Sequence, residues 1–438
     1  MTNLKHIWNF FASVKLAIFT LCSLAITSII GTIIPQGESP AFYAKQYGNE
    51  AAQFMQVLDI PDMYYSWWFL LLLLTLSVNL IVCSIERFPR VWKIIHTDNL
   101  QISAERVAKM ANVNEWQFAP EKSGVIDPIA IFKTINMTPD SRPVDGGTLY
   151  FSQSGKYSRT GVYLVHLSII VIFIGAIVGS ILGFKGSVMI PELQGTSKFF
   201  SSEDSSSIDL GFTVRCDEFI IEFYDNGMPK EYQSTLTVLE DGNEIFTKDI
   251  QVNSPLTYKG ITFYQSSYQG YQDFIFSVTD KKTGMNKEAI LPFQKQQNWE
   301  EADLRFGIVN AEALGQRVTK TKLWLKNGAS PAVLSWLGDN EDNIVTTEEN
   351  SYDVNVKQMY ATGLQVAKDP GVWIVYIGCG LMLVGLYMAF FLSHKRLWLF
   401  HDTSAANHKL ILGGNSNKNK IAFKQLFSKL ENKINKLA

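Results

Sequence analysis

Histidine is the residue type whose placement in this sequence carries the most chemical information. Five of the six histidines lie in polar segments, and His166 alone lies inside a long apolar block. An ionisable side chain inside a membrane helix is costly without a partner, so His166 is a functional candidate. The alternative interpretation is a neutral imidazole that donates a hydrogen bond to a neighbouring carbonyl or serine.

If His166 is a metal ligand, the iron of a haem is the guest that suits it best. A porphyrin is flat and apolar, fits between helices, and accepts an imidazole as axial ligand. Because one such histidine is present, a second axial ligand would come from another subunit. Electron-transfer cytochromes carry axial pairs in their own helices, so the chain looks incomplete as a member of that class. It has no Cys-x-x-Cys-His motif and is therefore not itself a c-type cytochrome.

The remaining residue patterns offer little other chemistry. The four cysteines lie too far apart for a disulfide framework or a zinc cluster, and Cys216 alternates with apolar residues as a buried core thiol would. We find no P-loop, no dinucleotide fingerprint and no Ser-His-Asp order. The net charge of −2 gives no case for nucleic-acid binding.

The composition points to the elements that must position these residues. Of the 438 residues 47% are hydrophobic and 18% charged, and the apolar residues gather in four blocks: 16–34, 66–85, 162–184 and 371–393. Each is long enough for a helix that crosses a bilayer. This excludes a purely soluble, disordered or fibrous protein. The first block is too long for a signal peptide and lacks a small-residue cleavage site, so we expect an uncleaved helix.

The charges between the blocks predict the topology. Three segments are basic: 1–15 before block one, 86–161 between blocks two and three, and 394–438 after block four. The last has nine basic residues against two acidic ones. The loops 35–65 and 185–370 are acidic, and the second of these has 17 basic and 27 acidic residues. By the positive-inside rule, both termini and 86–161 face the cytoplasm, and 185–370 lies outside.

The two polar regions differ in their patterns. Segment 185–370 reads as strands separated by Gly and Asn turns, which predicts a β-rich, sandwich-like domain or an open barrel. We expect an irregular or partly helical stretch at 328–350. Segment 86–161 reads as a mixed α/β domain. In the tail Phe423, Leu426, Phe427 and Leu430 share one helical face, which suits either the inner membrane leaflet or packing on the inner domain.

Several segments resemble those of the ResB (CcsB) family. They are Trp8 to Ala17, Gly31 to Gln36, Ser66 to Phe69, Asn79 to Ser84, Gly155 to Gly161 running into His166, Gly183 to Gly186, Asn253 to Gln265, and His394 to Trp398. The resemblance covers nearly the whole chain. It implies a subunit of the system II cytochrome c maturation machinery, with a ResC (CcsA)-type membrane protein as partner.

The resemblance also implies an activity and a site. Such a complex carries haem b across the membrane and joins its vinyl groups to the thiols of apocytochrome c, with a thioredoxin-like thiol reductase as a further partner. His166 matches the position of that family's intramembrane histidine and is the expected haem ligand. The tryptophan-rich haem motif of the ResC partner is absent, and 185–370 contains no histidine, so ligands on the outer face would come from ResC.

Two other functions remain open at this point. The chain could be a haem-free scaffold that docks apocytochrome for ResC, or, less consistently with its single intramembrane histidine, an electron-transfer subunit. The N-terminus does not resemble a transit peptide, which favours a bacterial plasma membrane, although an organelle-encoded protein would look the same.

Overall fold

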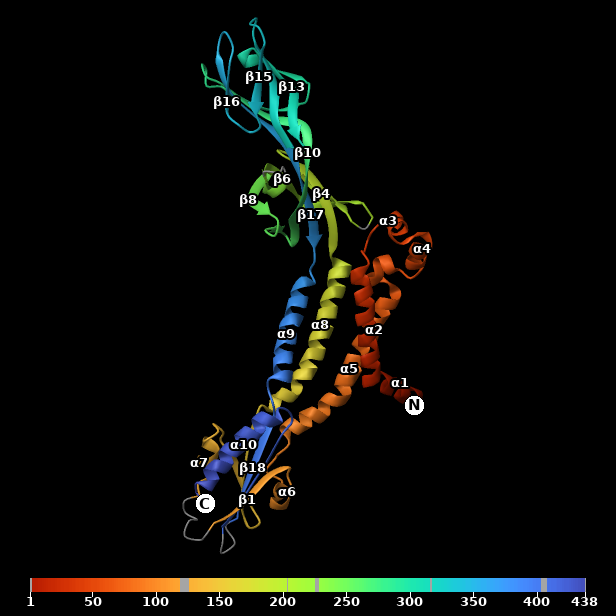
Figure 1. Ribbon diagram of the computed structural model, residues 1–438, viewed down its shortest axis with the longest axis vertical. Coiled ribbons are helices and arrows are strands. Elements are labelled where there is room, and N and C mark those ends of the chain that lie inside the picture. Colours follow the sequence, from red (N-terminus) through yellow and green to blue (C-terminus); the bar gives the residue numbers. More distant parts are fainter. Residues whose placement is uncertain are drawn as a thin grey trace. The chain divides into compact units, whose positions relative to one another are not determined.

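The computed structural model describes residues 2–118, 126–202, 204–224, 228–315, 317–402 and 408–437 (Figure 1). Four of its helices are long and apolar enough to cross a membrane. They are α2 (Val14–Ile33), α5 (Trp67–His96), α8 (Gly161–Leu182) and α9 (Val372–Phe390). The prediction of four apolar helices is confirmed. Helix α5 continues 11 residues past the predicted end at 85.

Short helices accompany these four. They are α1 (Thr2–Phe11), α3 (Pro40–Tyr47), α4 (Asn49–Val57), η1 (Ile60–Tyr65), α6 (Ala104–Ala108), α7 (Pro128–Lys133), η3 (Lys156–Thr160), η4 (Glu300–Ala302) and α10 (Lys420–Asn435).

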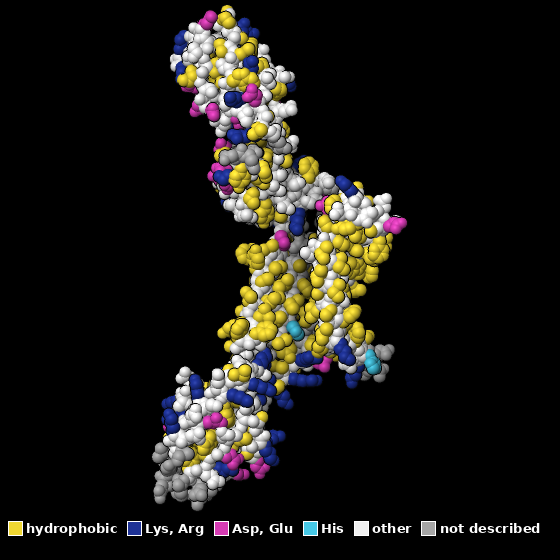
Figure 2. All heavy atoms as spheres, in the orientation of Figure 1, with side chains coloured by type: hydrophobic (Ala, Val, Ile, Leu, Met, Phe, Trp, Pro, Cys, Tyr) yellow, Lys and Arg dark blue, Asp and Glu magenta, His cyan; other side chains and the backbone are white. Residues whose placement is uncertain are grey.

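The apolar helices pack in two ways. Helices α8 and α9 approach each other through glycines, because a Cβ on Gly385 would lie 2.9 Å from the Val165 nitrogen and one on Gly378 would lie 3.1 Å from the Ser168 oxygen. Small residues let two backbones come close where no hydrophobic effect drives association. Helices α2 and α5 pack through larger side chains, including Leu24, Phe69 and Leu80. Figure 2 shows the hydrophobic side chains that cover the outside of these helices.

A small α/β domain is built from residues 97–154 and 395–437. Its five-stranded antiparallel sheet has the order β1-β19-β18-β3-β2. The strands are β1 (Asn112–Phe118), β2 (Asp140–Val144), β3 (Gly147–Ser154), β18 (Lys395–Asp402) and β19 (His408–Ser416). The C-terminal tail thus supplies the centre of a sheet whose other strands lie more than 240 residues earlier.

Both faces of this sheet are covered, which explains the unbroken apolar run in β18. Leu397 and Leu399 pack beneath α7 and α10, whereas Trp398 and Phe400 pack on the other face beside α6. Phe423, Phe427 and Leu430 of α10 are buried in the first of these cores, and Leu426 packs against it. Of the two alternatives for the amphipathic tail, packing on its own domain is therefore the one observed.

The large β domain occupies residues 184–368, between α8 and α9 in the chain. A ten-stranded sheet contains the path β11-β10-β17-β4-β5-β6-β7-β8, with β16 on β17 and β9 on β10, and a second sheet has the order β12-β13-β14-β15. Their bounds are β4 (Phe184–Pro191), β5 (Gly195–Ser201), β6 (Ser207–Phe223), β7 (Pro229–Glu240), β8 (Asn243–Gln251), β9 (Leu256–Tyr258), β10 (Ile261–Asp280), β11 (Asn286–Pro292), β12 (Gln296–Trp299), β13 (Leu304–Leu314), β14 (Arg317–Asn327), β15 (Val333–Gly338), β16 (Asn343–Thr346) and β17 (Ser351–Lys368).

The two longest strands, β10 and β17, run through two separate cores. The first core includes Phe199, Phe219 and Phe263, and the second lies between the two sheets, where the Phe276 and Phe306 rings stack at 4.5 Å. Between the cores the pairing of β10 with β17 shifts register from Gly270 to Phe274. The prediction of a β-rich domain is confirmed, and this domain has two cores.

The expectation of an irregular or partly helical stretch at 328–350 was wrong. Residues Val333–Gly338 and Asn343–Thr346 form β15 and β16, and no helix lies in this stretch, all of which is described. Strand β15 pairs with β14, and β16 pairs with β17. These short strands carry few alternating apolar residues, so their hydrogen-bonding partners, rather than their own pattern, give them their structure.

Candidate functional site

His166 lies on the side of α8 that faces α5. The α9-facing side carries Gly161, Val165 and Ser168, so the face with Tyr163 and His166 turns the other way. The Tyr163 ring meets Phe88 of α5 edge-on at 5.2 Å, and His166 lies 6.2 Å from the Tyr163 ring. The imidazole is half-buried and lies beside an aromatic pair between the two helices.

The hydrogen bonding of His166 uses one ring nitrogen. Its Nδ1 lies 2.9 Å from Ser84 Oγ on α5, and no hydrogen bond from a described residue reaches Nε2. When the ring donates its Nδ1 proton to Ser84, Nε2 keeps the lone pair that an axial ligand needs. The two interpretations of His166, a hydrogen bond to a serine and a bond to iron, are therefore compatible because they use different ring nitrogens.

In the described part of the chain, no hydrogen bond or ring contact brings a second histidine to His166. Among the described residues, no three His, Cys, Asp or Glu side chains gather as a metal site. His96, at the end of α5, bonds through Nδ1 to the Trp92 carbonyl of its own helix at 2.9 Å. A haem iron takes only one or two ligands from a protein, so a single histidine is compatible with haem.

His394 follows α9 and has a different environment. Arg159 Nε donates to its Nδ1 at 2.9 Å, its Nε2 lies 2.9 Å from Gln153 Oε1, and its backbone N–H donates to Asn417 Oδ1 at 2.7 Å. Because an arginine only donates, Nδ1 carries no proton and Nε2–H donates to Gln153. Burial, with the charges of Arg159, Arg396 and Lys156, lowers the His394 pKa to about 4. His394 is therefore neutral and has both nitrogens engaged.

Two arrangements of this region were not predicted: the packing of Ser84 and Phe88 against the His166 face, and the grouping around His394 of cations known from the sequence only as flanking charges or parts of resembling segments. Ser84 and His394 were noted only as parts of resembling segments. Their partners lie 82 and 235 residues away in the sequence, so only the intramembrane position of His166 was readable without the fold.

Cys216 lies in the core of the large β domain. It is buried with Phe219 and Val238, and burial, with the charges of Glu192 and Asp217, raises the pKa of its thiol to about 12. A thiol in this state is a poor nucleophile at neutral pH. The prediction of a buried core thiol is confirmed.

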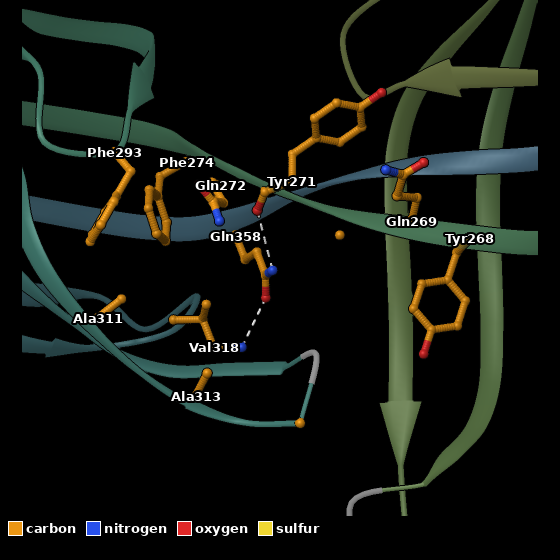
Figure 3. Close-up of a pocket in the computed structure, with 12 residues that line it drawn as sticks. Tyr268, Gln269, Tyr271, Gln272, Phe274, Phe293, Ala311, Ala313, Val318 and Gln358 are labelled. Atoms are coloured by element: carbon orange, nitrogen blue, oxygen red, sulfur yellow. Dashed lines mark hydrogen bonds between the residues drawn. The ribbon is translucent and has the colours of Figure 1, made fainter.

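The large β domain also contains a cavity of about 490 Å³ at the register shift of β10 (Figure 3). Aromatic rings of Tyr268, Phe274 and Phe293 line it, and Gln358 spans it by donating to the Tyr271 carbonyl at 3.3 Å and accepting from the Val318 N–H at 2.9 Å. None of the described lining residues is His, Cys, Lys, Arg, Asp or Glu. Its described lining offers rings, amides and the phenol of Tyr268, but no imidazole, thiolate or carboxylate.

Comparison with known proteins shows the family of this chain. The model of the ResB-like family matches residues 14–334 and 308–428. The chain belongs to the ResB-like family. This ResB-like chain is 27% identical to the cytochrome c biogenesis protein Ccs1 of Rhodomonas salina, over 97% of this chain and 95% of that protein.

Two cyanobacterial relatives give the same picture. The chain is 27% identical to the cytochrome c biogenesis protein CcsB of Nostoc sp. and 29% identical to that of Gloeobacter violaceus, in each case over 94% of this chain and 88% of the relative. The resemblance noted in the sequence is confirmed, and a role in cytochrome c maturation follows from the family.

Proposed function

We propose that this chain takes haem b at His166 and, with a ResC-type partner, carries it across the membrane to apocytochrome c for thioether formation. The observation that carries the proposal is the state of the His166 ring, whose Nδ1 is engaged by Ser84 while Nε2 has no described partner. The partner supplies the opposite axial ligand, because no second histidine among the described side chains lies at that face.

The membrane orientation in this proposal follows from the basic residues at one end of α5 and α8. Arg87, Arg90 and Lys93 lie in the last turns of α5, and Lys156 and Arg159 precede α8. By the positive-inside rule, this end of the helices and the small α/β domain face the cytoplasm of a bacterial cell, and the large β domain lies outside. His166 is then in the leaflet where newly made haem enters the plasma membrane.

The large β domain has a separate task in this proposal. It contains no histidine and its Cys216 is buried, so it holds apocytochrome c or braces the partner instead of ligating iron. The thiols of apocytochrome c must be reduced for thioether formation, which gives a thioredoxin-like thiol reductase a place beside this domain.

The test is co-expression with the ResC-type partner and a reporter apocytochrome c. We expect His166→Ala to lose most of the haem that co-purifies with the complex and most of the covalent haem on the reporter. His96→Ala is the matched control, because its imidazole bonds only within its own helix end, and we expect wild-type haem. Normal haem and normal reporter in His166→Ala would instead make this chain a haem-free scaffold.

A further inference from the structure

Three cations gather around His394 where α9 ends: Lys156, Arg159 and Arg396. Arg159 donates to His394, and Arg396 donates from Nε to Asn415 Oδ1 at 3.1 Å and from Nη1 to Asn99 Oδ1 at 3.4 Å. Arg396 also lies 5.4 Å from the ring centre of Trp398. Every group that accepts a hydrogen bond from these two arginines is neutral.

No carboxylate balances this cation cluster (Lys156, Arg159 and Arg396). None of the ion pairs among the described residues includes any of the three, whereas Arg142 and Lys409 of the same small domain each pair with an acid. The charges that act on His394 are all positive, and burial together with Arg159 lowers the pKa of Arg396. Half-buried cations without an anion carry a desolvation cost that a bound anion would offset.

The cluster lies close to His166 along the membrane helices. Arg159 precedes His166 by seven residues, or roughly 10 Å along the axis. The η3 segment that carries Lys156 and Arg159 lies against α5, the helix that also carries Arg87. Figure 2 shows Lys and Arg side chains gathered where the hydrophobic surface of the helices ends.

Glu86, the acid next to Arg87 in the sequence, does not form an ion pair with the cation cluster or with Arg87 among the described residues. Ser84 and Phe88 of α5 face α8. Glu86 is two residues from each, about 200° around the helix, so it leaves the opposite face. Arg87, in contrast, lies about 60° from Ser84 and borders the His166 face. An anion near His166 would therefore meet arginines and not a carboxylate.

We infer that the cation cluster, with Arg87, binds the two propionate carboxylates of the porphyrin whose iron His166 ligates. The inference rests on the proposed function and names the recognition of its substrate. A porphyrin carries both carboxylates on one edge and its iron at the centre, and arginine forks suit carboxylates. A phospholipid head group offers the same anionic chemistry, but it would use neither the open His166 nitrogen nor the aromatic rings beside it.

The test compares two probes on the purified complex with the ResC-type partner, in nanodiscs of zwitterionic lipid. The probes are iron protoporphyrin IX and its dimethyl ester, which keeps the iron and ring and loses both charges. We expect the wild type to bind the diacid at least about tenfold more tightly than the ester. Equal binding of the two probes by the wild type would overturn the inference without any mutation.

Variants then show which residues cause the preference for the diacid. In Arg159→Gln/Arg396→Gln we expect the preference for the diacid to fall to within about twofold, with the wild-type haem spectrum retained because His166 is intact. Lys156→Gln removes a charge and no described hydrogen bond, and it should reduce the preference for the diacid in part. This variant keeps the test decisive if the double variant folds poorly. Arg142→Gln, which removes a surface ion pair of the same domain, is the control and should keep the full preference.

The outcomes separate this inference from the proposed function. Retained preference in the arginine variants, with loss only of binding to vesicles that contain anionic lipid, would assign the cluster to lipid and overturn the inference. An unchanged haem spectrum in His166→Ala would reject the iron ligand, and the ratio of diacid to ester affinity would still report on the cluster.

Discussion

His166 and His394 are two imidazoles near the same end of the membrane helices, and they differ in what their nitrogens do. His394 is buried, with Nδ1 and Nε2 both bonded to side chains from a distant part of the chain. His166 is half-buried and bonds only through Nδ1, to a serine of the adjacent helix. The fully bonded ring of His394 ties elements together, whereas His166, inside an apolar helix, keeps an Nε2 without a described partner, where we propose that it takes its ligand.

Removal of His394 is expected to have the largest effect and tests whether its role is structural. His394→Ala deletes a buried ring and leaves Arg159 and Gln153 without partners, so we expect a loss of about 4 kcal/mol in the stability of the small α/β domain. Amide hydrogen exchange of β3 and β18 measures the loss, because the hydrogen bonds between these strands belong to this domain. The haem that remains bound should keep its wild-type spectrum. A changed axial ligand in this variant would mean that His394, not His166, reaches iron.

The next effect is a pH dependence with a defined sign. Because the folded-state pKa of His394 is about 4 and the unfolded value is near 6.5, the unfolded chain takes up a proton first as the pH falls. The small α/β domain should lose roughly 3 kcal/mol of stability between pH 6.5 and pH 4, and none from this group above pH 7. Unfolding measured across this range in wild type and His394→Gln tests it. An equal pH dependence in both would remove His394 as the cause.

A smaller effect sharpens the account of His166. Ser84→Ala removes the group that holds Nδ1, and we expect haem affinity to fall about tenfold while the iron keeps its imidazole ligand. Haem titration of the complex measures the affinity. Ser77→Ala is the matched control, because the Ser77 hydroxyl donates to a carbonyl of its own helix at 2.8 Å. Equal affinities in the two variants would show that Ser84 does not orient the ring.

The parts of the structure that could be predicted from the sequence depend on patterns of residues that are neighbours in the chain. Four apolar blocks predict the membrane helices because length and composition suffice for a span. Strands such as β6 and β7 show period-two alternation around Cys216. The unique intramembrane histidine is likewise visible in the sequence, so the candidate ligand was found before its surroundings.

The parts that could not be predicted depend on pairing across long distances. The run Leu397 to Phe400 is apolar at every position, which by itself suits a helix or a strand. Its strand pairs with Tyr150 and Phe151 from another segment, so its identity depends on the fold. The Ser84 bond to His166 and the arginines around His394 arise in the same way, from side chains that meet only after the helices pack.

The most direct test of the central claim is the reduced-minus-oxidised haem spectrum of the purified complex with its ResC-type partner, in wild type and His166→Ala. The account predicts that the mutant loses or shifts the low-spin haem bands and that added imidazole restores them, because the free base takes the place of the missing ring. An unchanged spectrum in His166→Ala, with no response to imidazole, would contradict the claim that His166 ligates haem.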